Sequence, residues 1–274
     1  MSEWTWKSRD GLEMFSRSWK PAGEPSAVIC LVNGLGEHIG RYDHVGGAMV
    51  KNGFAMVGFD LRGHGKSGGP RGHTPGYQFL MDDISDFIAL VKGKFPGKPV
   101  FLYGHSLGAN LVINFAMREK PVINGVIATG PWLELAFQPP SSKVLLAKVM
   151  AGIMPGFTQP NGLDTSALSR VPSVEQAYLN DPLVHNKISA RMFLDTYQAG
   201  LWALDHAAEF PLPMLLINGT ADRICSVEAS KRFADANPEK VEGVFLDGWY
   251  HEVHNEAESD IVFSIFTKFI QKNI

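Results

Sequence analysis

Ser106 lies in the pentapeptide GHSLG, residues 104–108, which follows an apolar strand-like run and opens a helical pattern. A sharp strand-to-helix turn lifts a serine hydroxyl clear of the backbone, and the flanking glycines let the helix and the strand pass closely. The second match to G-x-S-x-G, GKSGG at 65–69, is followed by PRGHTPG, which cannot form a helix. We therefore predict that Ser106 is a nucleophile and that Ser67 is not.

A serine nucleophile needs a general base, and the base needs an acid that holds its tautomer. Asp222 follows the strand-like run PMLLING and is the predicted acid. Its alternative role is a loop carboxylate paired with Arg223. Asp247 is a weaker candidate because it lies too few residues from the histidines that it would have to orient.

The segment DGWYHEVHNE supplies two candidates for the base, His251 and His254. Asn255 can cap the helix that follows, with Glu258 as its reciprocal partner, and this would hold His254 at the helix start. His251 would then lie in the freer turn, so the local sequence favours it only slightly. The order of serine, aspartate and histidine along the chain is that of the α/β-hydrolase fold.

Two backbone amides are predicted to stabilise the oxyanion of an acyl-transfer reaction. One is the amide of Leu107, directly after the nucleophile, and the other is that of Leu35 in the loop LVNGLGEH. The alternative for the second loop is a plain glycine turn. The stretch DLRGHGKS fails the phosphate-loop pattern, and HEVHN fails the zincin spacing by one residue. We predict neither a metal site nor a cofactor.

Strand-like and helical patterns alternate along most of the chain, which predicts a mostly parallel sheet with helices on both faces. Compact apolar runs predict buried strands at 27–32, 54–60, 99–104, 122–130, 213–219 and 241–247. Two shorter strands around the Asp10-Gly11 turn are expected before them. Helical spacing appears at 77–91, 107–115 and 261–270.

The alternation stops between residues 134 and 208, where proline-rich short helical segments and no strand-like run occur. A structureless loop of this length is unusual in a compact domain. We predict a helical cap at 134–208, inserted into a core made of residues 1–133 and 209–274. The apolar segment 141–157 is expected to be a lid helix that lines an acyl tunnel and touches lipid surfaces, or else a helix packed on the core.

The composition narrows the class of protein. A net charge of −3 without a basic run excludes nucleic acid as the expected partner. No apolar stretch approaches the length that spans a bilayer, and the first residues lack the apolar core of a signal peptide. Cys30 and Cys225 lie in apolar surroundings, which predicts a reducing cytoplasmic location. The lid segment adds the expectation of peripheral contact with a membrane.

The motifs together resemble the monoacylglycerol lipase and lysophospholipase group of α/β-hydrolases, over nearly the whole chain. NGLGEHIGRY is similar to the group's HGxGEHxGRY loop, and FDLRGHGKSGG is similar to its DxRGHGxS loop. GHSLG, GTADRIC and YHEVHNE match its three triad segments in order. The resemblance implies a cytoplasmic serine hydrolase that cleaves monoesters of medium-chain or long-chain fatty acids.

The resemblance also assigns roles to individual residues. It makes His251 the base, and it places Glu37, Arg41 and His254 at the polar end of the site, where a glycerol head group would sit. Tyr178 of the cap is expected to join them. Glu37 and Arg41 have the alternative role of a salt bridge that holds the loop.

Three residues of the DxRGHGxS-like loop, Asp60, Arg62 and His64, are expected to be structural. Asn33 departs from the group, which usually has histidine there, although its side chain can still hydrogen-bond the backbone.

Three functions remain open on the sequence. The first is a monoacylglycerol lipase that acts on a single-chain lipid ester without a metal. The second is a lysophospholipase or a general carboxylesterase, which needs a different head-group site. The third is a non-catalytic ligand-binding member of the fold, which the complete serine, aspartate and histidine set argues against.

Overall fold

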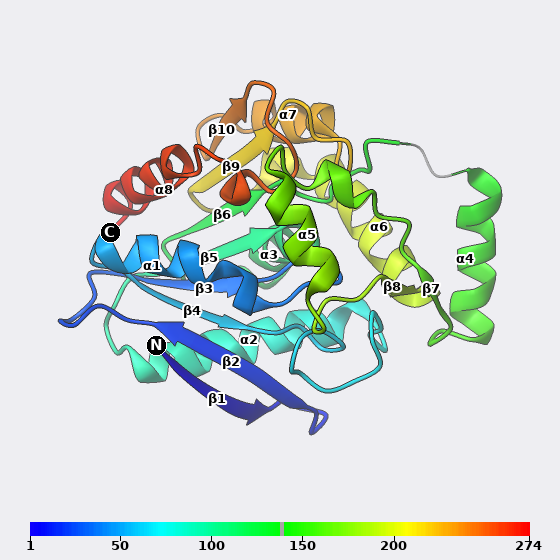
Figure 1. Ribbon diagram of the computed structural model, residues 1–274, viewed down its shortest axis with the longest axis horizontal. Coiled ribbons are helices and arrows are strands. Elements are labelled where there is room, and N and C mark those ends of the chain that lie inside the picture. Colours follow the sequence, from blue (N-terminus) through cyan, green and yellow to red (C-terminus); the bar gives the residue numbers. More distant parts are fainter. Residues whose placement is uncertain (138–139) are drawn as a thin grey trace.

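The computed structural model describes residues 1–137 and 140–274, and an eight-stranded sheet forms its centre (Figure 1). The strand order is β1-β2-β4-β3-β5-β6-β9-β10. All neighbours from β4 to β10 pair in parallel, whereas β1 and β2 are antiparallel. The strands are β1 (Ser2–Lys7), β2 (Glu13–Trp19), β3 (Val28–Val32), β4 (Ala55–Phe59), β5 (Val100–His105), β6 (Gly125–Thr129), β9 (Met214–Gly219) and β10 (Val241–Leu246).

Each predicted strand is present, and the hairpin of β1 and β2 turns at Gly11, whose φ is 81°. Strands β3, β4, β5, β6 and β9 are buried along their whole length, as apolar runs covered on both faces should be. One apolar cluster packs the sheet against α2 (Tyr77–Lys94), α3 (Leu107–Glu119) and α7 (Val227–Asp235). The other packs it against α1 (Asp43–Lys51) and α8 (Asp260–Lys272).

An inserted segment joins β6 to β9 and contains α4 (Ser141–Ile153), β7 (Thr158–Pro160), α5 (Pro172–Asn180), β8 (Lys187–Ser189) and α6 (Ala190–Asp205). The expectation of an insertion without strands was wrong, because β7 and β8 pair as a short antiparallel ribbon. Three-residue strands leave too little apolar alternation to be seen in the sequence, and these two are separated by residues 161–186. Residues 138 and 139 of the predicted cap lie outside the described residues.

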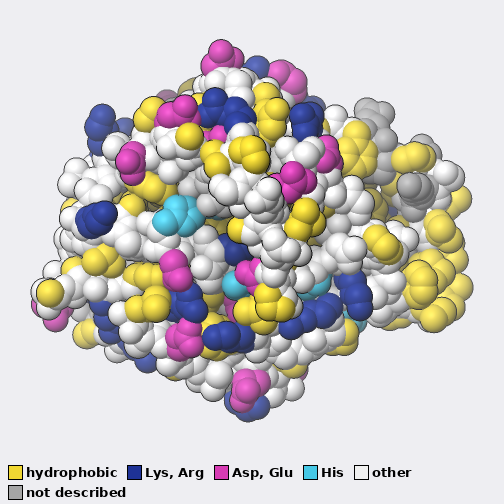
Figure 2. Space-filling view, viewed as in Figure 1, with side chains coloured by type: hydrophobic (Ala, Val, Ile, Leu, Met, Phe, Trp, Pro, Cys, Tyr) yellow, Lys and Arg dark blue, Asp and Glu magenta, His cyan; other side chains and the backbone are white. Residues whose placement is uncertain are grey.

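The two ends of the insertion differ in how they pack on the rest of the molecule. Helix α6 packs on α3, where the Asn110 and Asn114 side-chain amides donate to the carbonyls of Thr196 and Ala199. Helix α4 projects from the right of the molecule in Figure 1, beside α6. Its side chains Leu145, Leu146, Val149 and Ile153 are exposed, and Figure 2 shows hydrophobic atoms gathered over this region. None of the described helices is both long and apolar enough to cross a bilayer.

Candidate active site

Ser106 occupies the sharp turn between β5 and α3. Its φ of 54° lies in the left-handed region, which costs a non-glycine residue free energy and persists only where the fold enforces it. The Ser106 amide donates to the Thr129 carbonyl at 3.0 Å. A Cβ on Gly108 would overlap the carbonyl oxygen of Val32, so glycine is required for α3 to pass this close to β3. The backbone around Ser106 thus has the sharp strand-to-helix turn that the predicted role requires.

Asp222 and His251 form a buried pair beside this elbow. The His251 Nδ1 atom lies 2.7 Å from Asp222 Oδ2, and both side chains are almost fully buried. The other Asp222 oxygen accepts from the amides of Ile224 at 2.8 Å and Cys225 at 3.0 Å. These bonds fix the carboxylate, which in turn fixes the imidazole so that Nδ1 faces Asp222 and Nε2 is the ring nitrogen turned away from it.

The electrostatics of the pair suit a general base. Burial lowers the pKa of His251, but the neighbouring carboxylates, that of Asp222 above all, together outweigh burial and raise this pKa above its ordinary value. Glu252 and Glu37 act in the same direction. Burial raises the pKa of Asp222, but His251 and the backbone donors outweigh it, so Asp222 stays ionised. The alternative partner Arg223 instead contacts Asp164, at 3.4 Å.

Both predicted oxyanion donors lie close to the nucleophile. Leu107 is the first residue of α3, where an amide has no intrahelical partner. Leu35 lies in the loop after β3 and lines the same cavity as Ser106. The Asn33 side chain supports this loop, since its amide donates to the carbonyls of Gly34 and Glu37 and its oxygen accepts from the Leu61 amide.

A cavity of about 620 Å³ contains Ser106 and His251 at its wall. Most of the wall is apolar and includes Leu35, Trp132, Leu135, Leu168, Ile188 and Phe193. Helix α4 adds Leu146, Ala147 and Met150. This volume and apolar lining are in the range expected of a site for a small organic ligand.

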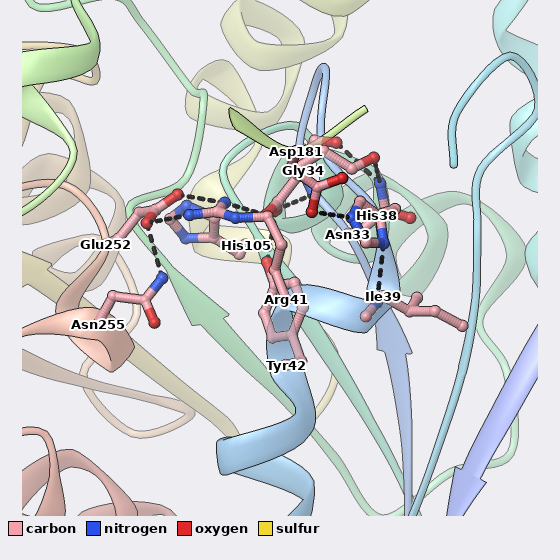
Figure 3. Close-up of polar contacts among 12 residues, drawn as sticks. Asn33, Gly34, His38, Ile39, Arg41, Tyr42, His105, Asp181, Glu252 and Asn255 are labelled. Carbon is pink, nitrogen blue, oxygen red and sulfur yellow. Dashed lines mark hydrogen bonds and ion pairs between the residues drawn. The ribbon is translucent and has the colours of Figure 1, made fainter. Parts of the chain in front are cut away.

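A charged network forms one polar part of the wall: Glu37 and Glu252 line the cavity, and Arg41 joins the two (Figure 3). The Arg41 Nη1 atom lies 2.6 Å from Glu37 Oε2 and 2.7 Å from Glu252 Oε1, and its Nη2 atom lies 2.8 Å from Glu252 Oε2. Glu37 also accepts from the Gly34 amide and from the Tyr42 hydroxyl. The salt bridge of Glu37 and Arg41, which was the alternative to a head-group role, is present, and Glu252 is a third member that sequence reasoning missed.

Tyr178 brings the cap to this network. Its ring lies over the Arg41 guanidinium, 4.8 Å from its centroid, and the side chain is 6% exposed. Among the described residues, its buried hydroxyl has no hydrogen-bond partner. Tyr178 lines the cavity together with Glu37 and Glu252, as expected for the polar end of the site.

The cap is also hydrogen-bonded to the loops that carry the site. The His185 amide donates to the Gly36 carbonyl at 2.8 Å, next to Leu35. His38 Nε2 lies 2.9 Å from Asp181 Oδ2, a contact visible in Figure 3. On the opposite loop, the Glu252 amide donates to the Leu168 carbonyl at 2.7 Å.

His254 lies beneath the site and away from the cavity wall. Its side chain is fully buried, and its ring stacks on Tyr42 with centroids 4.9 Å apart and meets His105 edge-on. Neither ring nitrogen has a partner among the described residues. Burial holds the pKa of His254 well below its ordinary value, so the ring is neutral. This position does not bring His254 to a head group in the cavity.

The expected helix start was also wrong. Helix α8 begins at Asp260, after Ser259, and residues Val253–Asn255 form a short 3-10 turn. The Asn255 side chain donates to Glu252 Oε2 at 2.7 Å and therefore does not cap the helix. The buried carboxylate of Glu252, three residues earlier, competes for the Asn255 side-chain amide, and its burial depends on the distant partner Arg41.

The loop residues expected to be structural have structural partners. The Asp60 carboxylate accepts from the amides of Ile39 and Lys66, and Arg62 pairs with Asp83 at 2.7 Å. His64 is fully buried, and burial lowers its pKa to about 3. Ser67 accepts from the Phe15 amide and donates to the Asp60 carbonyl. A search of residues 1–137 and 140–274 finds no cluster of His, Cys, Asp and Glu that could hold a metal ion.

A serine at a strained strand-to-helix turn, a buried aspartate–histidine pair and a mostly parallel sheet with an inserted cap together define an α/β-hydrolase. Solved structures agree: the monoacylglycerol lipase of Paleococcus ferrophilus superposes with a TM-score of 0.87 at 34% identity, over 95% of this chain and 99% of that one.

Sequence comparison gives the family. Residues 23–258 match the family described as "Serine aminopeptidase, S33", so the chain belongs to that family. It is 30% identical to the monoacylglycerol lipase of Mycolicibacterium smegmatis, over 100% of this chain and 98% of that protein. It is 34% identical to an abhydrolase domain-containing protein of Dictyostelium discoideum but spans only 28% of that protein's length. The chain is a monoacylglycerol lipase-like member of the carboxylic ester hydrolases.

Proposed function

We propose that the protein hydrolyses monoacylglycerols to a fatty acid and glycerol through an acyl-enzyme on Ser106. The observation that carries this proposal is the His251–Asp222 pair at the wall of the apolar cavity that also contains Ser106. The names of the relatives support the substrate class. The complete catalytic set argues against a purely ligand-binding role.

In the proposed first step, the Ser106 hydroxyl oxygen attacks the ester carbonyl carbon while His251 Nε2 accepts the hydroxyl proton. The amides of Leu35 and Leu107 stabilise the resulting oxyanion. The tetrahedral intermediate collapses, the carbon–oxygen bond to glycerol breaks, and His251 returns the proton to the departing glycerol oxygen. Water then repeats the sequence on the acyl-enzyme and releases the fatty acid, with no metal in any step.

The cavity suits a substrate with one acyl chain. Its apolar wall, which runs from Trp132 and Phe193 to the inner side of α4, fits an alkyl chain. The polar residues Glu37, Glu252 and Tyr178 also line the cavity, and they suit a hydroxylated head group. A triacylglycerol would need room for two further chains.

We test the nucleophile with a fluorophosphonate probe and mass spectrometry. The adduct should lie on Ser106, and Ser106→Ala should lose at least about 10⁴-fold in turnover. Ser67→Ala is the matched control, since it removes the other serine in a G-x-S-x-G pentapeptide, and it should still be labelled. An adduct on any other residue would contradict the mechanism.

A substrate panel tests the specificity. Monoacylglycerols should be cleaved much faster than triacylglycerols of the same acyl chain, and EDTA should not reduce the rate. Faster cleavage of triacylglycerols, or activity on short-chain esters alone, would reject a single-chain lipid as the substrate. A lysophospholipid with the same chain separates the lysophospholipase alternative.

The exposed apolar side of α4 supports a transient contact of the cap with a membrane or micelle. Leu145 and Ile153 are 63% and 72% exposed, and Phe157 after the helix is 49% exposed. Replacing Leu145 and Ile153 by serine should reduce cosedimentation with phosphatidylcholine vesicles without changing the hydrolysis of a monomeric ester. Unchanged cosedimentation would argue that the cap does not contact lipid.

A further inference from the structure

The charged network at the cavity wall holds more negative than positive charges. Two carboxylates, Glu37 and Glu252, share a single guanidinium, that of Arg41. The exposed fractions of the three side chains are 3%, 2% and 10% respectively, so water screens them little. One negative charge is therefore left over at the wall.

Arg41 is fully engaged on the side of these carboxylates. Its Nη1 atom bonds to both of them, its Nη2 atom bonds to Glu252, and the Tyr178 ring covers one face of the guanidinium. Burial lowers the pKa of Arg41, but Glu252 and Glu37 outweigh burial and raise it well above its ordinary value. An incoming anion would have to displace one of these bonds to reach the cation.

The other charges at the described cavity wall do not offset the excess. Arg223 is paired with Asp164, and both side chains are at least half exposed. Asp222 adds a further negative charge behind His251, which must be neutral to act as a base. The nearby His38 faces Asp181. A phosphate group therefore finds a negative environment with its cations already paired.

From this arrangement we infer that Glu252 is a specificity-determining residue, which makes the enzyme select single-chain esters with neutral or cationic head groups over those bearing a phosphate monoester. The inference rests on the proposed hydrolysis of monoacylglycerols and narrows its substrate class. A phosphate monoester carries about −1.5 to −2 charges at pH 7, and like charges in a poorly solvated site repel strongly.

The first experiment uses the wild-type protein and three soluble esters with the same decanoyl chain. Their alcohols are glycerol, glycerol 3-phosphate and 3-(dimethylamino)-1,2-propanediol. The two N-methyl groups of the third alcohol prevent migration of the acyl group to nitrogen. The kcat/KM for the phosphate ester should be at least about tenfold below that for the glycerol ester, which corresponds to about 1.4 kcal/mol. The cationic ester should match or exceed the glycerol ester.

The second experiment removes the excess charge. Glu252→Gln leaves Arg41 paired with one carboxylate, so the preference for glycerol over glycerol 3-phosphate should fall by about tenfold. Glu256→Gln is the matched control, because Glu256 is an equally buried carboxylate of the same loop, paired with Arg170 and not at the cavity wall. Its preference should stay at the wild-type value.

The outcomes separate this inference from the proposed function. Cleavage of none of the three esters would reject the proposed function itself. Equal kcat/KM for all three esters, with Ser106 labelled normally, would reject only the charge selection. A wild-type preference that Glu252→Gln leaves unchanged would reject the role of Glu252.

Discussion

We expect that the His254 side chain stabilises the fold by the packing of its ring and not by hydrogen bonds of its nitrogens. Replacing it by leucine tests this. The ring fills a space between Tyr42 and His105, while both nitrogens lack partners among the described residues. A buried polar atom without a partner costs about 1–3 kcal/mol, and an aromatic contact contributes about 0.5–1.5 kcal/mol. His254→Leu keeps most of the volume, so we expect the free energy of unfolding to stay the same or rise by about 1 kcal/mol.

His254→Ala is the contrast, because it removes the same nitrogens but leaves a cavity. Truncation of a buried side chain of this size costs about 2–5 kcal/mol. Urea denaturation of both variants gives their free energies of unfolding, and kcat/KM is measured on a monoacylglycerol and a p-nitrophenyl ester. If His254→Leu is destabilised by more than about 2 kcal/mol, or loses only monoacylglycerol hydrolysis, the ring nitrogens bind water or substrate and this reasoning is refuted.

Two further predictions concern the catalytic pair. His251→Ala should lose nearly as much turnover as Ser106→Ala, and combining the two should add little, because a triad acts as a unit; residual turnover of His251→Ala near the wild-type value would exclude it as the base. The raised pKa of His251 means that kcat/KM should fall as the pH drops through a value above about 6.5, since the protonated ring cannot accept the serine proton. Asp222→Asn, whose remaining activity should be low, removes the carboxylate that raises the pKa of His251, so the fall of kcat/KM should move to lower pH. An unchanged pH profile would contradict the assignment of Asp222 as the partner of the base.

The central sheet was predictable because its strands are buried on both faces. Short, fully apolar runs such as those of β3 and β9 are typical of strands that are covered on both faces. The predicted ranges differ from the observed strands by a few residues at the ends. The ribbon of β7 and β8 was not predictable, since Thr158–Pro160 and Lys187–Ser189 are short and mixed in character. Their pairing depends on the fold of the whole insertion.

The site divides in the same way. Ser106 and Asp222 stand at local turns whose residue types follow from the reaction, so they can be found one segment at a time. Glu252 could not be found in this way, because its partner Arg41 lies 211 residues away and a glutamate in a loop usually faces solvent. One signal was available: Glu252 lies between the candidate base His251 and the apolar Val253.

The hydrogen bonds between the cap and the site make the two parts cooperative. The segment from Asp181 to His185 is tied to the loop that carries Leu35, and Leu168 is tied to the loop that carries His251. Lifting this inner part of the cap would break bonds that hold the reaction geometry. A ligand that stabilised this position of the cap would therefore also stabilise the loop that carries Leu35, and the coupling free energy would be the same in both directions. Helix α4, which packs beside α6, takes no part in these hydrogen bonds between the inner cap and the two loops, so a displacement of α4 alone would leave them intact.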